Sequence, residues 1–496
     1  MRFLLENNLL IPEKLTDKPG AKRISEYESS YPQSLNPSYD YFPELQHLLH
    51  GKQLLLEEIP FSLEEIHMHY VNGYLHYRSC IEKTKDGYSC VRCGNTDQHL
   101  FASFKCARCK KNCTYCRKCI NMGRMSECTV LVSWCGSSPR VKLPDKPLAW
   151  DGTLSAGQQR ASTELIKAVE ANDQLLIWAV CGAGKTEILF EGIEVALRSG
   201  KRVCIATPRT DVVIELAPRI KASFPKVDVI ALYGGSEDRN KTAPITLATT
   251  HQLLRYYKAF DMIIIDEVDA FPYSAEPMLQ YAVDQAKKDV SSTIYLTATP
   301  NQTWKKEIAA GKRKAVTIPA RYHRHALPVP KFIWCGNWEK LLKKKKLPRN
   351  AMMWVKEHLK LGKQAFLFVP RITYLERIVD LLQTLDPRIE GVHAEDPDRK
   401  EKVARFRTGE IPILVTTTIL ERGVTVPNID VAVLGAEDQI FTESALVQIS
   451  GRVGRSAQFP TGDILFFHYG KTKEMIKAKK HIEEMNKEAL QNGFID

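Results

Sequence analysis

The stretch WAVCGAGKTEILF, residues 178–190, joins an apolar run to a segment of helical character. Gly182 and Gly184 would let backbone N–H groups converge on a phosphate, Lys185 can reach its oxygens, and the Thr186 hydroxyl is a ligand for Mg²⁺. Ala179 stands where the usual phosphate-binding loop begins with Gly, so the loop by itself also fits a tight strand-to-helix turn. The predicted nucleotide contacts of the loop are Cys181, Gly182, Ala183, Gly184, Lys185 and Thr186.

An acidic motif, MIIIDEVDA, follows about 80 residues later. Its apolar residues run directly into Asp266 and Glu267, at the predicted end of a strand. Carboxylates at that position suit a Mg²⁺ ligand, Asp266, and a base that activates water, Glu267. The order and spacing of the two motifs together predict an ATPase, with ATP and Mg²⁺ bound.

Short apolar runs alternate with helix-like stretches from Asp151 onward. Runs without polar alternation are typical of strands that are covered on both faces of a parallel sheet. The runs are QLLIWAV, KRVCIATP, VDVIALYGG, APITLATT, DMIIIDE and STIYLTATP, and, after about residue 350, QAFLFVP, IPILVTTT, DVAVLGA and GDILFFH. This pattern predicts an α/β protein with two tandem lobes.

The 496 residues are enough for about three domains. We predict a region without assigned role (1–79), a cysteine-rich module (80–136), a linker (137–150), a first lobe (151–320), a connector (321–349), a second lobe (350–470) and a terminal packing helix (471–496). The formal charge of +12 favours a polyanionic partner without specifying it. We find no signal peptide and no uninterrupted apolar stretch near about 18 residues, which predicts a cytoplasmic chain without a transmembrane segment.

Thirteen cysteines are present, and all except Cys181, Cys204 and Cys335 lie between Cys80 and Cys135. Their Cys-x-x-Cys spacing is typical of structural zinc sites in a reducing compartment. The preferred site is Cys90, Cys93, Cys116 and Cys119, with a possible second site of Cys106, Cys109, Cys113 and Cys128; the rival is a ribbon of Cys90, Cys93, Cys106 and Cys109. We expect Cys80 and Cys135 to be buried free thiols. The cations around these cysteines either bind nucleic acid or form a solvated face. They are Lys105, Arg108, Lys110, Lys111, Arg117, Lys118 and Arg124.

Further segments resemble the motifs of superfamily 2 helicases, in the same order. TPRTDVVIELAPRI (207–220) and ATTHQLL (248–254) resemble the strand-tracking motifs of the first lobe, and TAT (297–299) resembles the motif that couples hydrolysis to lobe movement. TTTILERGVTVPNIDV (416–431) and QISGRVGR (448–455) resemble those of the second lobe. The resemblance implies two RecA-like domains, preceded here by a zinc module.

This resemblance also implies roles for individual residues. Arg452 and Arg455 would stabilise charge on the transferred phosphate, alongside Gln448, and Gln158 would read adenine. Gly423 would lie at the nucleotide; two residues later Thr425 replaces the usual Asp, so a ribose hydrogen bond would be weaker. The implied nucleic-acid contacts are Pro208, Arg209, Thr250, His251, Thr417 and Arg422.

Narrower segments, including YCRKCINMGR, DEVDAFPY, TTTILERGV and PTGDILFFHYG, resemble the ComFA family of competence helicase-like ATPases of Gram-positive bacteria. We place this resemblance from about residue 90 to the end, with nothing added by residues 1–79. It implies a single-stranded-DNA-dependent ATPase at the inner face of the membrane. The implied partners are the DNA-uptake channel, a ComFC-type phosphoribosyltransferase-like protein and DprA.

Two alternatives remain open. One is a replication-restart helicase of the PriA type, although its zinc module lies within the helicase region, whereas here the cysteines precede the first lobe. The other is a zinc-dependent DNA-binding scaffold with a vestigial ATP site, against which the intact Lys185, Asp266, Glu267 and Arg455 argue. Polarity, oligomeric state, unwinding of duplex, and DNA rather than RNA as the track do not follow from the motifs.

Overall fold

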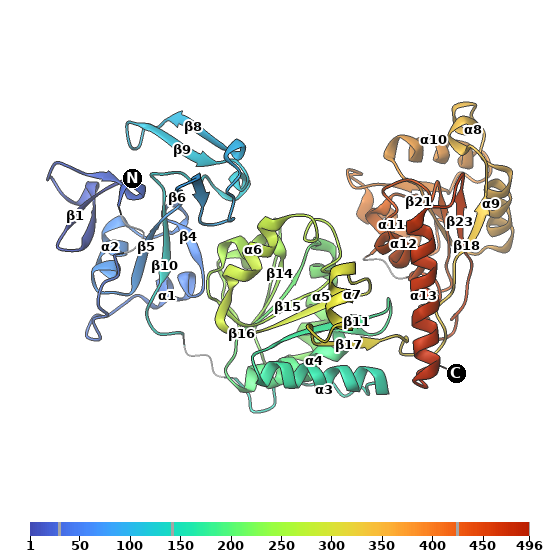
Figure 1. Cartoon of the computed structure of the whole chain (residues 1–496), viewed down its shortest axis with the longest axis horizontal. Helices are drawn as coiled ribbons and strands as arrows, with labels where there is room; N and C mark the ends of the chain where they lie inside the picture. The colour runs from blue at the N-terminus through green and yellow to red at the C-terminus, as the bar shows by residue number, and fades with distance from the viewer. Residues whose placement is uncertain (28–30, 140–142, 423–425, 496) are drawn as a thin grey trace. The chain divides into compact units, whose positions relative to one another are not determined.

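The computed structural model describes residues 1–27, 31–139, 143–422 and 426–495. The chain divides into two compact units. The first consists of residues 1–151, 166–174 and 191–294, and the second of residues 152–165, 175–190 and 295–496. Figure 1 labels the helices and strands of both units.

A seven-stranded sheet has the order β13-β14-β12-β15-β16-β11-β17. Its strands are β11 (Gln174–Ala179), β12 (Val203–Thr207), β13 (Val229–Leu232), β14 (Ile245–Thr249), β15 (Phe260–Ile265), β16 (Lys287–Thr297) and β17 (Ala315–Ile318). The pairs β12 with β14, β12 with β15, β13 with β14, and β11 with β17 are parallel. The connecting helices are α3 (Ala156–Glu170), α4 (Lys185–Arg198), α5 (Thr210–Ser223), η6 (Glu237–Asn240), η7 (Thr250–Arg255), α6 (Pro277–Ala286) and α7 (Gln302–Ala309).

A six-stranded parallel sheet follows, in the order β18-β23-β22-β19-β21-β20. Its strands are β18 (Lys331–Trp334), β19 (Ala365–Phe368), β20 (Glu390–Val392), β21 (Ile413–Thr416), β22 (Asp430–Leu434) and β23 (Ile464–His468). Its helices are α8 (Trp338–Lys343), α9 (Arg349–Leu361), α10 (Ile372–Gln383), α11 (Arg399–Arg407), η8 (Thr418–Leu420), α12 (Glu443–Ser450) and α13 (Lys473–Gln491).

Alternate residues of these six strands enter two separate cores. On one face, Phe366 and Phe466 pack with side chains of α11, α12 and α13; on the other, Leu367 and Phe467 pack with α8, α9 and α10 (Figure 1). Helices on both faces explain why these strands are continuously apolar. The predicted fold class, two RecA-like parallel sheets behind a cysteine-rich module, is confirmed.

The first 135 residues form a separate set of small sheets. Its elements are β1 (Arg2–Glu6), β2 (Leu9–Pro12), β3 (Lys22–Arg23), η2 (Ile24–Glu26), α1 (Pro43–Leu49), β4 (Gln53–Leu55), η3 (Leu56–Glu58), α2 (Leu63–Val71), β5 (Leu75–Ser79), β6 (Ile81–Thr84), β7 (Gly87–Cys90), β8 (Phe101–Lys105), β9 (Asn112–Cys116), η5 (Ile120–Met122) and β10 (Val130–Trp134). Strand β10 pairs with β4 and β5. The boundary predicted at residue 79 therefore divides two regions that share one sheet.

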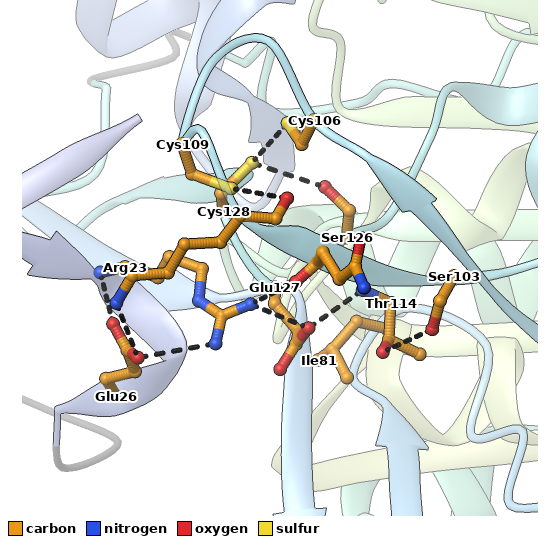
Figure 2. A network of polar contacts seen from close by, with 12 residues as sticks. Arg23, Glu26, Ile81, Ser103, Cys106, Cys109, Thr114, Ser126, Glu127 and Cys128 are labelled. Carbon is orange, nitrogen blue, oxygen red and sulfur yellow. Dashed lines mark hydrogen bonds and ion pairs between the residues drawn. The ribbon is translucent and has the colours of Figure 1, made fainter.

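A buried ion pair joins the start of the chain to the cysteine-rich module, as Figure 2 shows. The Arg23 guanidinium lies 3.0 Å from the Glu127 carboxylate and donates to the carbonyl oxygen of Asn112 at 2.8 Å. The same carboxylate accepts from the backbone N–H of Thr114 at 2.8 Å. Both charged side chains are largely buried, and Arg23 has a second carboxylate partner, Glu26, at 3.3 Å, so loss of Glu127 leaves buried donors of Arg23 and Thr114 without their acceptor.

Within the described parts of the chain, no helix combines the length and apolar character that a membrane-spanning helix needs.

We predict that Glu127→Gln lowers the local stability of this region by about 1–3 kcal/mol, because Arg23 loses a buried acceptor but keeps its ion pair with Glu26. Hydrogen exchange of the β9 and β10 amides measures the change. The matched control is Glu82→Gln, which removes a more exposed pair with Arg78 at 3.1 Å and should cost less than about 1 kcal/mol. Equal effects of the two substitutions would contradict the importance of the buried pair.

Candidate functional site

The predicted phosphate loop lies between β11 and α4, where a nucleotide site requires it. Gly182 has φ of +83° and Gly184 has φ of +71°, a backbone conformation that glycine adopts without strain. Helix α4 begins at Lys185, so its first N–H groups and the positive end of its dipole face the loop. The turn therefore has the backbone that an anion site needs.

The predicted adenine contact, Gln158, is buried against this loop. Its Nε2 donates to the carbonyl oxygen of Ala183 at 2.9 Å, and its Oε1 accepts from the backbone N–H of Ser155 at 2.8 Å. A Cβ on Gly184 would lie 2.4 Å from the Gln158 Nε2, so this side chain requires glycine there. Gln158 thus supports the loop itself, and adenine recognition stays a prediction.

Within the second unit, the loop contacts the late motif QISGRVGR directly. The Cys181 thiol donates to Oε1 of Gln448 at 3.0 Å. A Cβ on Gly451 would lie 2.4 Å from the Cys181 Cβ, so only glycine permits this approach. The resemblance to helicase motifs predicted that the loop and the late motif act together. In the structure, Cys181 packs directly on Gly451 of that motif.

One arginine that the sequence did not single out connects the same two segments. Arg321 is 2% exposed and donates from Nε to the carbonyl oxygen of Cys181 at 3.1 Å. Its other nitrogens donate to the carbonyl oxygens of Val453 at 2.7 Å, of Gly451 at 3.2 Å and of Gly454. Burial, and then the positive charge of Arg455, lower the pKa of Arg321 to about 10, which still leaves it charged at neutral pH.

The TAT motif and helix α12, which carries Gln448, also meet in this unit. The hydroxyl groups of Thr299 and Ser444 lie 2.9 Å apart. Near them, the Lys305 ammonium lies 3.1 Å from the Glu443 carboxylate. These contacts give the predicted coupling motif a direct polar connection to the helix that carries Gln448.

The two late arginines differ in exposure. Arg452 is 2% exposed and donates to the carbonyl oxygen of Leu420 at 2.9 Å, whereas Arg455 is partly exposed and donates to the carbonyl oxygen of Gly451 at 2.9 Å. Arg452 therefore supports the chain that follows β21, and Arg455 is the better placed to meet a ligand. Gly423 and Thr425, also predicted near the nucleotide, lie outside the described residues.

The acidic pair follows β15, in the first unit, as predicted. The backbone N–H of Asp266 donates to the carbonyl oxygen of Ala206 on β12 at 2.8 Å, which fixes the end of the strand. Glu267 has φ of +56°, an uncommon conformation for a residue with a side chain, and its N–H donates to the Asp266 carboxylate at 2.8 Å. Strain of this kind is frequent at functional positions.

The six predicted nucleic-acid residues are not equally accessible. Arg209, His251 and Thr417 are partly exposed, whereas Pro208, Thr250 and Arg422 are buried. The Arg209 guanidinium pairs with Asp211 at 3.0 Å, and that of Arg422 lies 3.6 Å from Glu421. The buried members could act only through their backbone or by supporting their neighbours.

The cysteines form two groups of four thiols, each with all sulfur atoms within 4.8 Å of one another. One group is Cys90, Cys93, Cys116 and Cys119, and the other is Cys106, Cys109, Cys113 and Cys128. The first group is the preferred zinc site predicted from the sequence, and the second group is the possible second site. The rival ribbon does not fit, because its two cysteine pairs lie in different groups. Neither Cys80 nor Cys135 belongs to a group; Cys80 is buried as expected, whereas the expectation that Cys135 is buried is wrong, because it lies exposed just after the end of β10.

The spacing of the sulfur atoms fits zinc. A tetrahedral ion with bonds of about 2.3 Å separates its sulfur ligands by about 3.8 Å. The structure has 3.8 Å between Cys90 and Cys119, 3.7 Å between Cys93 and Cys116, and 3.6 Å between Cys106 and Cys128. Four thiolates per ion leave no open position, so the expected role is structural.

A second residue missed from the sequence, Arg92, supports the first cysteine group. Its Nη2 lies 3.3 Å from the Cys119 sulfur and 2.8 Å from the Cys119 carbonyl oxygen. A donor to a metal-bound thiolate orients the ligand and reduces its negative charge. Its position inside the first Cys-x-x-Cys pair was the available signal.

Several cations of the cysteine-rich module already have partners. Arg108 pairs with Glu57, Lys111 lies 3.5 Å from Glu26, and Lys118 lies 3.8 Å from Glu276. Arg124 stacks over Phe104, with 4.7 Å from its guanidinium carbon to the ring centroid. For these four cations, the contacts favour a solvated face with structural ion pairs over a nucleic-acid contact.

Three family models match the chain in sequence order. They are Competence protein ComFA N-terminal domain over residues 36–133, Type III restriction enzyme, res subunit over residues 151–302, and Helicase conserved C-terminal domain over residues 344–457. Competence protein ComFA of Bacillus subtilis (strain 168) is 52% identical over 443 residues, which cover 89% of this chain and 95% of that protein. The chain belongs to the ComFA family.

Competence protein ComFA of Streptococcus pneumoniae (strain ATCC BAA-255 / R6) is 40% identical over 378 residues, covering 76% of this chain and 86% of that protein. The solved structure of S. cerevisiae Dbp5 bound to RNA and ADP BeF3 has a TM-score of 0.51 at 16% identity, covering 67% of this chain and 88% of that one, and bears on the fold alone. With the two helicase-type family models and this family membership, the chain is an ATP-dependent helicase-like protein.

The expectation that the ComFA resemblance begins near residue 90 is wrong, because the N-terminal family model begins at residue 36. The physical reason is the shared sheet: β4 and β5, which precede the cysteines, pair with β10, which follows them. Residues of the region left without assignment therefore form one folding unit with the cysteine-rich module.

We predict two zinc ions per ComFA chain, one for each cysteine group. Replacing Cys90 and Cys93 with Ser should remove one ion, and replacing Cys106 and Cys109 should remove the other, as measured by elemental analysis of purified protein. Cys135→Ser is the matched control, since Cys135 lies outside both groups, and should retain two ions. A zinc content that the paired substitutions do not change would contradict the assignment.

We predict that Arg321→Met lowers ATP turnover at saturating nucleotide at least tenfold. The substitution leaves buried carbonyl oxygens without their donor, at about 1–3 kcal/mol each, and releases the loop from the late motif. Arg324→Met, an exposed neighbour on the same connector, is the control and should retain turnover. Turnover unchanged in a folded Arg321→Met protein, with folding checked by thermal unfolding, would contradict this role.

Proposed function

We propose that this ComFA-family chain is an ATP-driven translocase on single-stranded DNA that drives uptake of transforming DNA during natural competence. The observation that carries the proposal is the packing of the phosphate loop on the late motif, through Cys181, Gly451 and Arg321. Such contact would make the geometry at the phosphates depend on the position of the second lobe. The similarity to competence proteins over most of the chain supports the biological role.

Lys185 and the backbone N–H groups of the loop would hold the β and γ phosphates. Thr186 and Asp266 would hold Mg²⁺, which when bound neutralises charge on the phosphate oxygens. Glu267 would orient the attacking water and accept its proton, and its constrained backbone supports a fixed position for that carboxylate. The two acidic residues end a buried strand, so little reorganisation is needed.

Arg455 would stabilise the negative charge that develops on the transferred phosphate. Its partial exposure supports this choice over Arg452, which would instead hold the segment after β21 through the Leu420 carbonyl. Gln448 would transmit movements of the phosphate loop to its own helix, α12, through its hydrogen bond with Cys181. Hydrolysis would change these contacts and thereby the position of one lobe relative to the other.

The track would be single-stranded DNA, bound through its backbone with little dependence on sequence. Arg209, His251 and Thr417 are the accessible candidates for contact. The zinc-bound cysteine groups would keep the N-terminal region folded. As a cytoplasmic protein at the inner face of the membrane, the chain would act with the uptake channel, a ComFC-type protein and DprA.

We predict that Lys185→Ala lowers ATP turnover by about 100-fold or more, because it removes a cation that stabilises the transferring phosphate. Binding of single-stranded DNA, measured by fluorescence anisotropy, should change little. Lys312→Ala, an exposed lysine outside the loop, is the matched control and should turn over ATP at the wild-type rate.

The test compares wild-type turnover with single-stranded DNA, duplex DNA and RNA at one salt concentration. Stimulation mainly by single-stranded DNA supports the proposal. Stimulation by RNA alone, or turnover that survives in Lys185→Ala, would refute it. DNA binding without any turnover in the wild type would favour a scaffold with a vestigial ATP site.

A further inference from the structure

A cavity of about 200 Å³ lies in the first unit, where the N-terminal region packs on the seven-stranded sheet. The segment before β4 reaches this sheet through several backbone contacts. Lys52 forms an antiparallel bridge with Tyr256, and the N–H of Tyr257 donates to the carbonyl oxygen of Gly51 at 3.1 Å. The Thr242 hydroxyl donates to the carbonyl oxygen of His47 at 2.7 Å.

Three cations and one carboxylate line this cavity: Lys52, Arg239, Arg255 and Glu58. The carboxylate of Glu58 is shared between the guanidinium groups of Arg239, at 2.9 Å, and Arg255, at 3.1 Å. The Lys52 ammonium donates to the carbonyl oxygen of Lys241 at 3.0 Å, which offers no full charge. The lining therefore carries two more positive than negative charges.

Carboxylates near the cavity do not correct this imbalance. Asp238 pairs with Lys241 at 2.7 Å, and Asp261 pairs with Lys288 at 2.8 Å. Arg202, which is partly buried, adds a further positive charge that acts on Lys52, and Asp261 offsets part of it. A buried charge without a counter-charge is unfavourable, so the fold maintains this cluster at a cost in stability.

Proton affinities agree with an excess of positive charge. Lys52 is only 2% exposed. Burial, and then the positive charges of Arg202 and Arg255, lower the pKa of its ammonium group to about 8. Burial is also the main cause of the lowered pKa of Arg202 and of Arg255. The buried Nε of Arg255 has no hydrogen-bond partner among the described residues. An anion in the cavity would relieve these effects.

The elements around the cavity indicate which anion. Helix η7 begins at Thr250 and His251, two of the predicted nucleic-acid residues, and its later residues Gln252 and Arg255 line the cavity. Helix η6 supplies Arg239 and Asn240 from the other side. Amides and guanidinium groups are the usual donors to phosphate oxygens.

We propose that this cavity holds a backbone phosphate of the nucleic-acid strand, with Arg239, Arg255 and Lys52 as its cationic contacts. The strand would cross η7 from the partly exposed His251 to the cavity. The N-terminal region would then contribute Lys52 to the DNA-binding surface of the protein. This inference rests on the proposed function, since it assigns one phosphate of the strand that the motor binds.

The test measures binding of a fluorescent single-stranded oligonucleotide to full-length protein over a series of salt concentrations. One phosphate contact on a single strand contributes about 0.7 to the slope of log K against log salt. Arg239→Gln should reduce the slope by about this amount, and should raise the DNA concentration for half-maximal ATPase stimulation without changing turnover in the absence of DNA. The Arg239 side chain is 55% exposed, so the variant is expected to fold.

Arg388→Gln is the matched control, because Arg388 is 63% exposed and pairs with Asp386 at 2.7 Å, as Arg239 pairs with Glu58. It should leave slope and affinity unchanged. Equal slopes for wild type, Arg239→Gln and Arg388→Gln would overturn the inference while the proposed function stands. Wild-type protein without salt-dependent DNA binding would overturn both.

Inorganic phosphate distinguishes the source of the anion. If the site serves the strand, millimolar phosphate added at constant ionic strength should weaken DNA binding by the wild type more than by Arg239→Gln. If phosphate raises the unfolding temperature of the wild type alone, and Arg239→Gln keeps the wild-type DNA slope, the cavity is a site for a free anion, and the assignment to the strand is overturned.

Discussion

The buried guanidinium of Arg321 is the constraint on which the packing of the candidate nucleotide site depends. A planar group with several N–H donors cannot remain in an apolar interior without acceptors, and here the acceptors are backbone carbonyl oxygens on both sides. One is Cys181 in the phosphate loop, and the others belong to residues 451–454. One side chain therefore bonds to two segments that lie about 270 residues apart in sequence, and the contacts of Cys181 with Gln448 and Gly451 add to this connection. Movement of Cys181 would alter this set of bonds, so the loop and residues 451–454 are physically linked through Arg321.

A different constraint governs the N-terminal region, whose cysteine-rich module is too small to fold around an apolar interior. The core cluster around Cys106 consists of four cysteines, with Phe104 packed against it. Small modules with so little apolar surface commonly depend on a metal for stability. The ion pair of Arg23 with Glu127 adds a tie to the first strands of the chain. Together these contacts explain why the first 135 residues behave as one region although only the cysteines stand out in the sequence.

The sequence predicted the interior of both sheets better than their margins. All ten apolar runs are strands, because a strand covered on both faces must be continuously apolar. The strands missed, β17, β18 and β20, lie at sheet edges, where partial exposure permits residues such as Lys331 and Glu390. The terminal helix was found because α13 keeps a buried stripe, from Met475 to Ala489, and ends just before Gly493.

The same contrast holds for the candidate site. The two cysteine groups were predicted correctly, and Lys185 and Asp266 could be proposed as site residues, because their chemistry imposes a local spacing. Arg321 and Lys52 were not found, because their importance arises from partners more than 100 residues away, which no local pattern records. Thr250 and Arg422 matched helicase motifs, yet both side chains are buried, since a motif specifies identity without specifying which atoms face the solvent.

The pairing of β5 with β10 has a consequence for how this family can change. Ser79 lies opposite Val130, so the chain leaves the sheet and returns to it at neighbouring positions after enclosing all eight clustered cysteines. The cysteine-rich module is thus an insertion with adjoining ends. Changes in the length of loops within this insertion would leave the register of β5 and β10 unaltered, provided that Glu127 keeps its buried pair with Arg23.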